Sequence, residues 1–571
     1  MKADESQILD AHGRPASMTI PAQSKRSFEG ARVSRLETDW HTAQTSMDHD
    51  LRWQLKRLID RSRWFEQNSE YGEGYLKLME RNVLGPEPFT LQMKVTEPDG
   101  THDKLAEQAI ETAWKDWGRK ENCDLSHSLS LSDHYRVALR AMLRDGGALI
   151  IKHTGMSLGK YAFRIEARDI DFLDPDYNVD LKNGGRIVMS VELDTVGRPI
   201  AYHLLGSHPG DTYWTSRNQM RTRVMSSRVI HPFIRTRSNQ TRGFPQFAAI
   251  MPNFRQFSGY REAAVVASRI GASGMGWLTK SPGEGEQWSG DRNPNGGFYM
   301  NFEPGTVHEL PIGYHYESHK PDHPQTAYSE FVKEHLRGGA AALGVSYANL
   351  ANDAGDANFS SQRVHSIEER EQYKMTQRVF REHVCEDIFA SWLAASLMAG
   401  AIRVPSAGRE PRPIPVEKFD KMNHPVFRGR GWQWLDPRNE SMAAKTDMET
   451  GVVSKAQIIA QRGGDEEEVQ DEIRQSIEQD MELGLVGTTR LEAMARGRAM
   501  VAATETETKE PMLAKLGVNG MQALSMFIQQ LGQGEMTPEA VMVMLKSVFG
   551  FSDADAKTIA DSAKQPQQNT T

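Results

Sequence analysis

The 571-residue chain has only two cysteines, Cys123 and Cys385. Neither lies in a Cys–X–X–Cys pair or beside a histidine at the spacing of metal ligands. Two isolated thiols cannot build a disulfide framework or a four-ligand zinc site. We therefore expect both to pack as small apolar groups, which is typical of proteins from a reducing compartment.

Long hydrophobic runs are missing as well. The best candidate, residues 388–402, is short and amphipathic, whereas a membrane helix needs roughly 20 consecutive apolar residues. Residues 1–30 contain no apolar run of the length found in a secretory signal peptide. The sequence therefore predicts no membrane span and no targeting segment, which excludes a membrane channel.

The chain also lacks an excess of positive charge. It carries 68 Lys and Arg against 76 Asp and Glu, which gives a net charge of -8 and an isoelectric point near 6.2. Proteins that hold nucleic acid tightly usually have a basic face and a high isoelectric point. This balance argues against tight binding, but it allows a surface along which DNA slides, because acidic walls repel phosphates.

Motifs of catalysis are absent. The nearest match to a nucleotide-binding P-loop, residues 155–161, is one residue too short and has Tyr161 where Ser or Thr would bind magnesium. The glycines at 271, 274 and 276 follow a predicted helix, whereas a dinucleotide fingerprint follows a strand. No His–Glu–X–X–His or Gly–X–Ser–X–Gly motif occurs. We therefore predict no catalytic residue, no metal site and no cofactor, and the chain is not expected to be an enzyme.

Two groups of residues allow both a binding and a structural interpretation. One is an acidic cluster, which could hold a cation but is also typical of turns at strand edges: Asp169, Asp171, Asp174 and Asp176. The other mixes basic and aromatic residues, which could stack on single-stranded nucleic acid or form a packed aromatic corner: Lys421, Arg428, Arg430, Trp432 and Trp434. We favour the structural interpretation in both cases.

Hydrophobic periodicity then shows what is present. Helical spacing of apolar residues predicts helices over 50–82, 103–118 and 133–146, with Trp53, Leu55, Leu58 and Ile59 on the first of them. Alternating apolar residues predict a mostly antiparallel β region over 148–235, with a hairpin at Asn183-Gly184. An extended stretch is also expected near residues 88–95.

The second half of the chain is predicted to be mainly helical. Helices are expected over 245–275, 327–343 and 360–400, the last being the longest, with a loop of small residues at 344–359. Further on, Ser454 to Gln457 form a capping-box pattern and Pro538 stands at the first position of another helix. No internal repeat is seen, and the fold class is α+β.

The order of several short segments in the middle of the chain resembles the lambda-type (lambdoid) family of tailed-bacteriophage portal proteins. The segments are Val229–Phe233, Arg242–Pro245, Glu303–Gly305, Leu343–Tyr347, Leu350–Asp353 and Asn358–Arg363. Each is short, and only their succession is specific. The resemblance covers roughly residues 30–480.

This resemblance implies a portal fold that assembles as a homo-dodecameric ring. It implies a flexible N-terminal arm (1–30), a wing (31–244), a stem helix (245–275), a clip (276–324), a second stem helix (325–343), a tunnel loop (344–359), a long helix with a return to the wing (360–444), and a helical crown with a disordered tail (445–571). The helical extension after about residue 505 is longer than the family pattern, and the resemblance assigns it no role.

The resemblance also implies function and partners. The ring would be the channel at one capsid vertex of the virion, through which terminase packages double-stranded DNA and from which DNA is later ejected. Expected partners are other copies of the chain, the terminase large subunit, the head–tail adaptor, and the major capsid and scaffold proteins, with assembly in the host cytoplasm. DNA would pass transiently and without sequence specificity.

Two sets of site residues follow from this placement. The tunnel loop contains no Lys or Arg, which suits a surface that brushes a duplex without condensing onto its phosphates; its candidate DNA contacts are Asn352, Asp353, Asp356 and Asn358. A closed ring needs two different complementary surfaces on each subunit; the stem candidates are Arg255, Arg261, Arg269, Glu330, Lys333 and Glu334. The alternative for the loop residues is that they merely connect two helices, although we favour the DNA contact. The stem residues could equally form ordinary solvated helix faces.

Two other functions stay open at this point. The chain could be a packaging-associated enzyme, an ATPase or a nuclease, although it lacks the motifs for either. It could also be another minor head or adaptor protein, but the length and the segment from Val345 to Arg363 favour a portal protein.

Overall fold

The computed structural model describes residues 44–97, 102–211, 220–272, 276–280, 314–318, 328–353, 359–406, 409–432, 436–464, 466–482 and 537–547, with a few isolated positions besides. The predicted N-terminal arm and most of the predicted clip lie outside these residues. The chain divides into two compact units, residues 1–465 and 466–571. Each is described below by itself.

The first unit begins with helices α1 (Met47–Asn68) and α2 (Glu70–Met79), followed by a π-helical turn, η3 (Glu80–Leu84). The Ser69 side chain caps α2 by accepting a hydrogen bond from the Gly72 N–H. Leu55 and Ile59 lie in the core, but Trp53, predicted to share their stripe, is 66% exposed. Residues two apart on a helix point about 200° apart, so Trp53 cannot face the core together with Leu55.

The next helices carry the aromatic centre of the core. They are α3 (Lys104–Trp117), α4 (Lys120–Cys123) and α5 (Leu131–Arg144), and strand β1 (Thr90–Met93) pairs with the distant β14 (Pro425–Arg428). Trp114 lies 5.0 Å from Trp392 and 5.5 Å from Phe389, centroid to centroid. Both partners belong to a helix almost 280 residues further along the chain, so the first and last thirds of this unit share one core.

The predicted β region forms two antiparallel sheets. The first has the order β3-β2-β9, from β2 (Leu149–Thr154), β3 (Phe163–Arg168) and β9 (Val229–Ile230). The second has the order β4-β5-β6-β7-β8, from β4 (Val179–Asp180), β5 (Arg186–Val188), β6 (Val191–Leu193), β7 (Pro199–Leu205) and β8 (Arg221–Met225). Short 3₁₀ turns interrupt the region at η5 (Ile170–Phe172) and η6 (Ser226–Arg228).

Two segments of this region were singled out in the sequence: the predicted hairpin at Asn183-Gly184 and the P-loop-like residues 155–161. Strands β4 and β5 pair antiparallel, and Gly184 in the turn between them has φ +80°, so the predicted hairpin is confirmed. Asp180 pairs with Arg186, so the turn is longer than two residues. The P-loop-like segment forms η4 (Met156–Leu158) between the paired strands β2 and β3, so it connects two antiparallel strands and does not precede a long helix.

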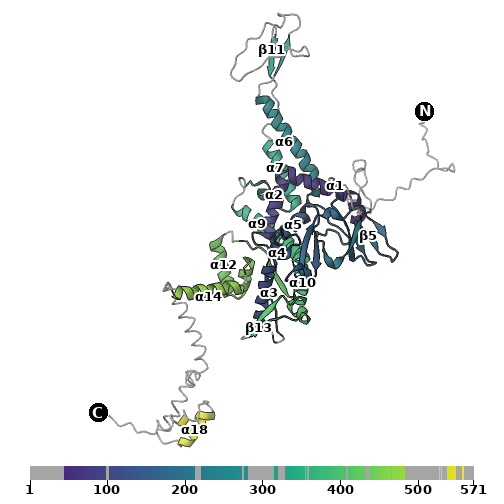
Figure 1. Cartoon of the computed structure of the whole chain (residues 1–571). Coiled ribbons are helices and arrows are strands. Elements are labelled where there is room, and N and C mark those ends of the chain that lie inside the picture. The colour runs from purple at the N-terminus through teal and green to yellow at the C-terminus, as the bar shows by residue number, and fades with distance from the viewer. Residues whose placement is uncertain are drawn as a thin grey trace, which may run out of the picture. The chain divides into compact units, whose positions relative to one another are not determined.

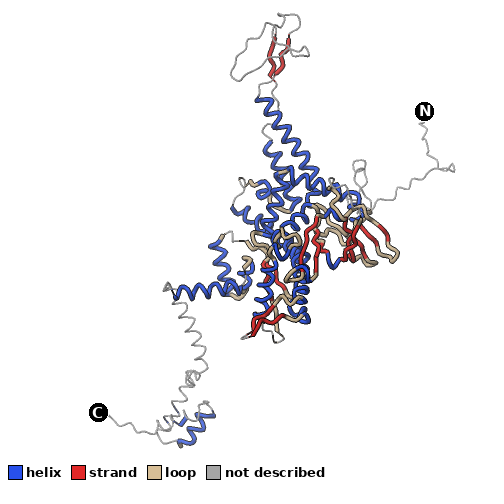
Figure 2. The backbone as a smooth tube through the Cα atoms, in the orientation of Figure 1, coloured by secondary structure: helices blue, strands red, loops and turns tan. Residues whose placement is uncertain are grey.

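Helices α6 (Met251–Ala272) and α7 (Tyr328–Leu343) pack as an antiparallel pair, preceded by the 3₁₀ turn η7 (Gln246–Ala249). Two short strands, β10 (Gly276–Lys280) and β11 (Tyr314–Ser318), pair antiparallel beyond the far end of α6 (Figures 1 and 2). The predicted helices are confirmed. Gly271 lies in the last turn of α6 and Gly276 begins β10, whereas Gly274 lies outside the described residues.

The long helix predicted over 360–400 is present but not uniform. It consists of α9 (Phe359–Phe380), the π-helical turn η8 (Arg381–Cys385) and α10 (Glu386–Met398). A π turn inserts one residue into the helical repeat and often marks a functional position. In η8, Val384 and Cys385 are fully buried, whereas Glu382 and His383 are exposed.

The first unit closes with shorter elements: β12 (Arg403–Ser406), β13 (Arg409–Pro413), η9 (Val416–Lys418), α11 (Phe419–Met422), β14, α12 (Pro437–Glu449) and α13 (Lys455–Gln461). The predicted capping box of Ser454 and Gln457 is confirmed. The second unit contains α14 (Glu466–Glu482) and α18 (Pro538–Ser547), and the latter begins at the predicted proline.

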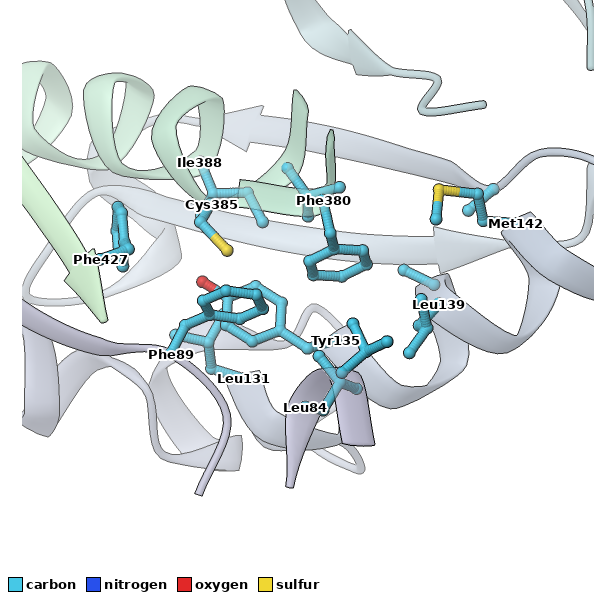
Figure 3. Packing of buried hydrophobic residues seen from close by; sticks show 14 of the residues in the cluster. Leu84, Phe89, Leu131, Tyr135, Leu139, Met142, Phe380, Cys385, Ile388 and Phe427 are labelled. Atoms are coloured by element: carbon cyan, nitrogen blue, oxygen red, sulfur yellow. The ribbon is translucent and has the colours of Figure 1, made fainter. Parts of the chain in front are cut away.

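Both cysteines are buried, as predicted. Cys385 lies among Phe89, Tyr135 and Phe380, where the Phe89 and Phe380 rings stack 5.7 Å apart (Figure 3). Burial raises the pKa of the Cys123 thiol to about 12 and raises the pKa of Cys385 as well. Among the described helices, none combines the length and apolarity that crossing a membrane requires.

Candidate functional site

The α6–α7 pair is held together by aromatic rings along its length. Tyr260 packs 4.5 Å from Phe331 and 5.9 Å from Tyr328, and Phe257 packs 5.6 Å from His335. Nearer the core, a Cβ atom on Gly339 would lie 2.4 Å from the Phe254 ring. The absent side chain therefore allows the two helices to approach closely at this point.

The base of the pair packs against helices α1 and α2 at the start of the first unit. Phe254 packs against Phe65 of α1 (5.5 Å) and Tyr71 of α2 (5.7 Å), and Phe247 packs against Phe65 (5.0 Å). Edge-to-face contacts of this kind add about 0.5–1.5 kcal/mol each beyond the burial of their area. The two helices thus project from a rigid base and do not depend on their mutual contact alone.

The segment after α7 is the predicted tunnel loop, and it is more ordered than its composition suggested. Gly344 turns the chain with φ +68°, and the Ser346 side chain then caps a short helix, α8 (Tyr347–Ala351). Leu350 is buried, and the Asn349 side chain donates to Glu369 of α9 at 2.5 Å. The expectation of an irregular loop over the whole of 344–359 is therefore wrong for α8.

Two of the four predicted DNA contacts lie directly after α8. Asn352 is exposed and has a left-handed backbone (φ +51°, ψ +40°), which asparagine tolerates better than most residues. Asp353 accepts hydrogen bonds from the Gly355 N–H (3.0 Å) and the Tyr347 hydroxyl (2.9 Å). These bonds lower the pKa of Asp353, so its carboxylate shapes the turn. The other two, Asp356 and Asn358, lie outside the described residues.

Cations from α7 reach this loop, which the sequence of the loop itself does not reveal. The charge of Lys333 contributes to lowering the pKa of Asp353, after the two hydrogen bonds. The Arg337 guanidinium lies 5.7 Å from the centroid of the Tyr347 ring. The loop has no basic residue in its own sequence, but α7 supplies two positive charges beside it.

The six predicted interface residues of the stem differ in their surroundings. Arg255 stacks over the Trp64 ring at 5.2 Å, and Arg261 pairs with Glu70, which raises the pKa of Arg261. Both are therefore engaged within their own subunit. Arg269, Glu330 and Glu334 are exposed, and Lys333 is half-buried near the loop. A role for any of them between subunits stays a prediction.

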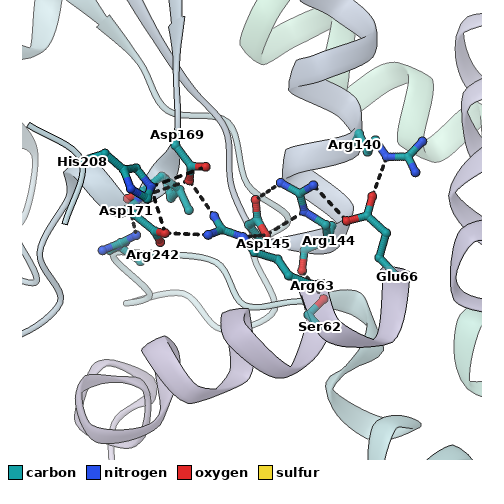
Figure 4. A network of polar contacts seen from close by, with 11 residues as sticks. Ser62, Arg63, Glu66, Arg140, Arg144, Asp145, Asp169, Asp171, His208 and Arg242 are labelled. Carbon is teal, nitrogen blue, oxygen red and sulfur yellow. Dashed lines mark hydrogen bonds and ion pairs between the residues drawn. The ribbon is translucent and has the colours of Figure 1, made fainter. Parts of the chain in front are cut away.

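Three members of the acidic cluster pair with arginines: Asp174 with Arg221, and Asp169 and Asp171 with Arg63. Arg63 of α1 contacts Asp145 (3.0 Å), Asp169 (2.6 Å) and Asp171 (2.5 Å) in one network (Figure 4). Burial alone would lower the pKa of Arg63, but the bond to Asp145 and the three negative charges raise it. Asp169, Asp171 and His208 do present ligand atoms close together, but both carboxylates already neutralise Arg63, which favours the structural interpretation.

The basic and aromatic residues near 421–434 form a packed corner, as we favoured. Trp432 stacks on Tyr373 at 6.2 Å and donates from Nε1 to Asn82 at 3.3 Å. Lys421 pairs with Glu97, and Arg428 donates to Gln92 at 2.8 Å. Trp434 lies outside the described residues. The four described members are committed to contacts within the chain, so a stacking site for single strands finds no support.

Comparison with known proteins identifies the family. The family model described as phage portal protein, lambda family, matches residues 33–377, which is more than half of the chain. The chain belongs to the lambda family of phage portal proteins. The predicted resemblance is confirmed. So is the prediction that the chain is a structural protein and not an enzyme, because portal proteins of this family are structural.

Individual relatives agree along most of the chain. A probable portal protein of Halomonas phage phiHAP-1 is 29% identical over 494 residues, covering 85% of this chain and 93% of the relative. Portal protein B of Escherichia phage lambda is 21% identical over 476 residues, covering 77% and 87%. The family-model match includes α6, α7 and the loop after α7. Together, these matches support the portal protein of a tailed phage over an enzyme or another head protein.

Solved structures give a weaker likeness. The neck of an empty gene transfer agent particle, computed with C6 symmetry, matches at 11% identity and a TM-score of 0.36, covering 72% of this chain and 93% of that chain. A native gene transfer agent virion matches at 10% identity and a TM-score of 0.37. Scores this low carry no argument about the geometry of this chain.

Proposed function

We propose that copies of this chain close into a homo-dodecameric ring at one capsid vertex, through which double-stranded DNA is packaged by terminase and later ejected. The observation that carries the proposal is the α6–α7 pair with the α8 turn at its base. A rigid helical projection and a short anchored loop are the parts that a channel wall requires: one keeps the pore open and the other meets the passing duplex.

The proposed DNA contact is the turn after α8. Asn349 and Leu350 hold α8 on the core, so Asn352 is presented from a fixed base. Asp353, Lys333 and Arg337 then give the turn charges of both signs. A wall of mixed charge neither repels the duplex strongly nor holds its phosphates, since tight binding requires many cationic contacts. Asp356 and Asn358 remain further candidates.

The proposed regions follow the described elements. Residues 31–244 and 360–444 form the wing, 245–275 and 325–343 the stem, 276–324 the clip, and 445–571 the crown. The strand pair β10–β11 lies within the clip, where the terminase large subunit and later the head–tail adaptor would dock. The other partners would be the major capsid and scaffold proteins, with assembly in the host cytoplasm before incorporation into the virion.

The exposed stem charges are proposed to contribute to ring closure. Arg269 on α6 and Glu330 and Glu334 on α7 are exposed and opposite in sign. A head-to-tail ring brings different faces of neighbouring subunits together, so cations on one helix can meet carboxylates on the other. Arg255 and Arg261 would act indirectly, by fixing the base of the stem against α1 and α2.

Electron microscopy of the purified chain, with mass measurement, tests this function. We expect a closed ring with a central hole wide enough for duplex DNA and no ATP hydrolysis. A variant shortened within residues 352–358, so that α8 keeps its anchors, should still form the ring but package less DNA in the presence of terminase. A matched deletion within residues 1–30 serves as the control and should package normally.

A compact monomer or dimer that hydrolyses ATP or cuts DNA would refute the channel. A ring whose packaging is unaffected by the shortened loop would refute the DNA contact while leaving the channel intact.

A further inference from the structure

Helix α1 exposes two tryptophans on one face. Trp53 is 66% exposed and Trp64 is 45% exposed, although tryptophan is usually among the more buried residues. They are 11 residues apart, about three helical turns, and Arg57 and Arg61 stand between them within about 80° of the same direction. We call Trp53, Arg57, Arg61 and Trp64 the α1 strip.

The α1 strip is separate from the part of α1 that stabilises the fold. The opposite side of the helix buries Leu51, Leu55, Ile59, Ser62 and Phe65. Within the described part of the chain, neither Arg57 nor Arg61 makes an ion pair or a side-chain hydrogen bond. Tryptophan and arginine are the residue types most enriched at the energetic centres of protein interfaces. The strip therefore resembles one side of an interface that this chain alone does not fill.

Both tryptophans are held in place before any partner arrives. Arg52 stacks over the Trp53 ring at 4.8 Å, and Arg255 of α6 stacks over the Trp64 ring at 5.2 Å. Rings fixed in this way lose little conformational freedom on binding, which strengthens association. The stacked arginines also make this surface more positive.

Helix α9 exposes a strip of the same length that carries carboxylates where α1 carries arginines. Val364 (55% exposed) and Met375 (65%) are again 11 residues apart, and Ile367 (47%) lies between them. Glu368 and Glu371 are exposed on the same face, the latter paired with Lys374. The opposite side of α9 buries Tyr373 and Phe380. We call Val364, Ile367, Glu368, Glu371 and Met375 the α9 strip.

The two strips lie on different helices of the first unit. Figure 1 shows α1 and α9 on either side of α2 and α5, within the first unit. A head-to-tail ring needs two different, complementary patches on separate sides of each subunit. In each strip two apolar anchors about 16 Å apart, from 11 residues at 1.5 Å per residue, enclose two charges of one sign. The cations of α1 thus match the carboxylates of α9 in number, and the two charges of each strip lie about one helical turn apart.

We propose that the α1 strip of each subunit docks on the α9 strip of its neighbour in the ring. This inference rests on the proposed ring and assigns a subunit interface away from the stem. The occupant is a second copy of this chain, because the charge and the spacing of the apolar anchors are complementary. Aromatic and basic strips also bind single-stranded nucleic acid by stacking, so nucleic-acid binding is an outcome that the test must separate.

Charge reversal tests the pairing. One variant carries Arg57→Glu and Arg61→Glu, and the other carries Glu368→Arg and Glu371→Arg. Because like charges facing each other across an interface are repulsive, each variant alone should assemble at least about tenfold less readily, measured as the fraction of chain in closed rings by mass photometry. Circular dichroism and thermal melting should show that both variants are folded. A matched control, Lys115→Glu with Lys120→Glu, reverses two exposed cations elsewhere and should assemble normally.

Mixing the two variants gives the decisive result. Each reversed α1 strip would then face a reversed α9 strip, and the two wild-type strips would face each other, so rings of alternating subunits should form. Such rings contain an even number of subunits. Combining all four substitutions in one chain should also restore assembly.

The outcomes separate the two proposals. If the wild-type chain forms no ring, the proposed function fails and the interface fails with it. If the wild-type chain forms rings and either reversed variant assembles equally well, only the interface is refuted. Variants that keep the ring but lose affinity for single-stranded DNA would assign the α1 strip to nucleic acid. Reduced assembly without rescue on mixing would also overturn the pairing of α1 with α9.

Discussion

His231 is a histidine whose ring nitrogen Nε2 is buried without a hydrogen-bond partner among the described residues. The residue as a whole is half-buried, between the rings of Tyr202 (5.7 Å) and Phe233 (5.2 Å). Burial, and then the positive charge of Arg242, lower its pKa from 6.5 to about 3. The folded protein therefore holds this imidazole in its neutral form.

Stability should consequently fall in mild acid. The unfolded chain takes up the proton near pH 6.5, and the folded chain does so only near pH 3, so the free energy of unfolding decreases as the pH falls through this range. Between pH 7 and pH 5 we expect a loss of roughly 1–2 kcal/mol from this residue, at 1.36 kcal/mol per pH unit. His231→Phe should reduce that loss in urea unfolding at the two pH values, whereas His383→Phe, at an exposed histidine, should not. An unchanged acid loss in His231→Phe would contradict the assignment.

The burial of some residues could be predicted from the sequence, but the spatial partners of individual side chains could not. The burial of both cysteines followed from their number and isolation. The exposure of Trp53 was missed because the prediction grouped it with Leu55, although residues two apart on a helix point about 200° apart. The partnership of Arg63 with Asp145, Asp169 and Asp171 joins residues about 80–110 positions apart, and spacing along the chain carries no information about it.

At the scale of elements, helix α7 of the α6–α7 pair has two neighbouring glycines in different environments. A Cβ atom on Gly339 would lie 2.4 Å from the Phe254 ring, whereas one on Gly338 would meet nothing within 4 Å. Phe254 is itself packed against Phe65 and Tyr71, so its ring has little room to move. The same substitution at these two positions should have effects of opposite sign.

Gly338→Ala should stabilise the protein by up to about 1 kcal/mol, because alanine favours the helix over glycine. Gly339→Ala should destabilise it by roughly 1–3 kcal/mol, because the added methyl group overpacks the contact with α6. Thermal unfolding of the two variants measures the difference, and each serves as the control for the other. Equal stabilisation by both would show that α6 and α7 do not pack closely at Gly339.

The presence of helices and strands could be predicted from the sequence better than the pairing of the strands or the irregular turns. The existence of α6, of α7 and of the antiparallel β region followed from apolar periodicity, although α6 begins later than residue 245, after the 3₁₀ turn η7. The division of the strands into two sheets did not follow, because periodicity does not report which strands pair. The π turn η8 could not be predicted for a related reason, because one inserted residue barely disturbs the apolar periodicity of a long helix. Helix α8, with five residues, is too short to show a period, and only Ser346 as a cap hinted at it.

At the scale of the whole molecule, any change in one subunit is repeated around the proposed ring. This repetition makes the net charge of the loop important, since each copy adds its charges to the same pore. The described loop residues and α7 offer Asp353 against Lys333 and Arg337, a near balance that individual substitutions can shift. The exposed position of Asn352 makes it the natural site for such a change.

Asn352→Lys should therefore slow the passage of DNA. One added cation per subunit would give the pore a ring of ammonium groups, each able to contact a phosphate and release a counterion. The affinity of the ring for duplex DNA should rise at low salt, and the logarithm of that affinity should fall more steeply with the logarithm of salt concentration, by about 0.9 for each additional phosphate contacted. Binding to assembled rings across a salt series measures this slope, and packaging by terminase should slow in parallel. Gln67→Lys, which adds the same charge at an exposed position on α1, should leave both quantities unchanged. If the two variants behave alike, Asn352 does not face the DNA and the loop after α8 is not part of the channel wall.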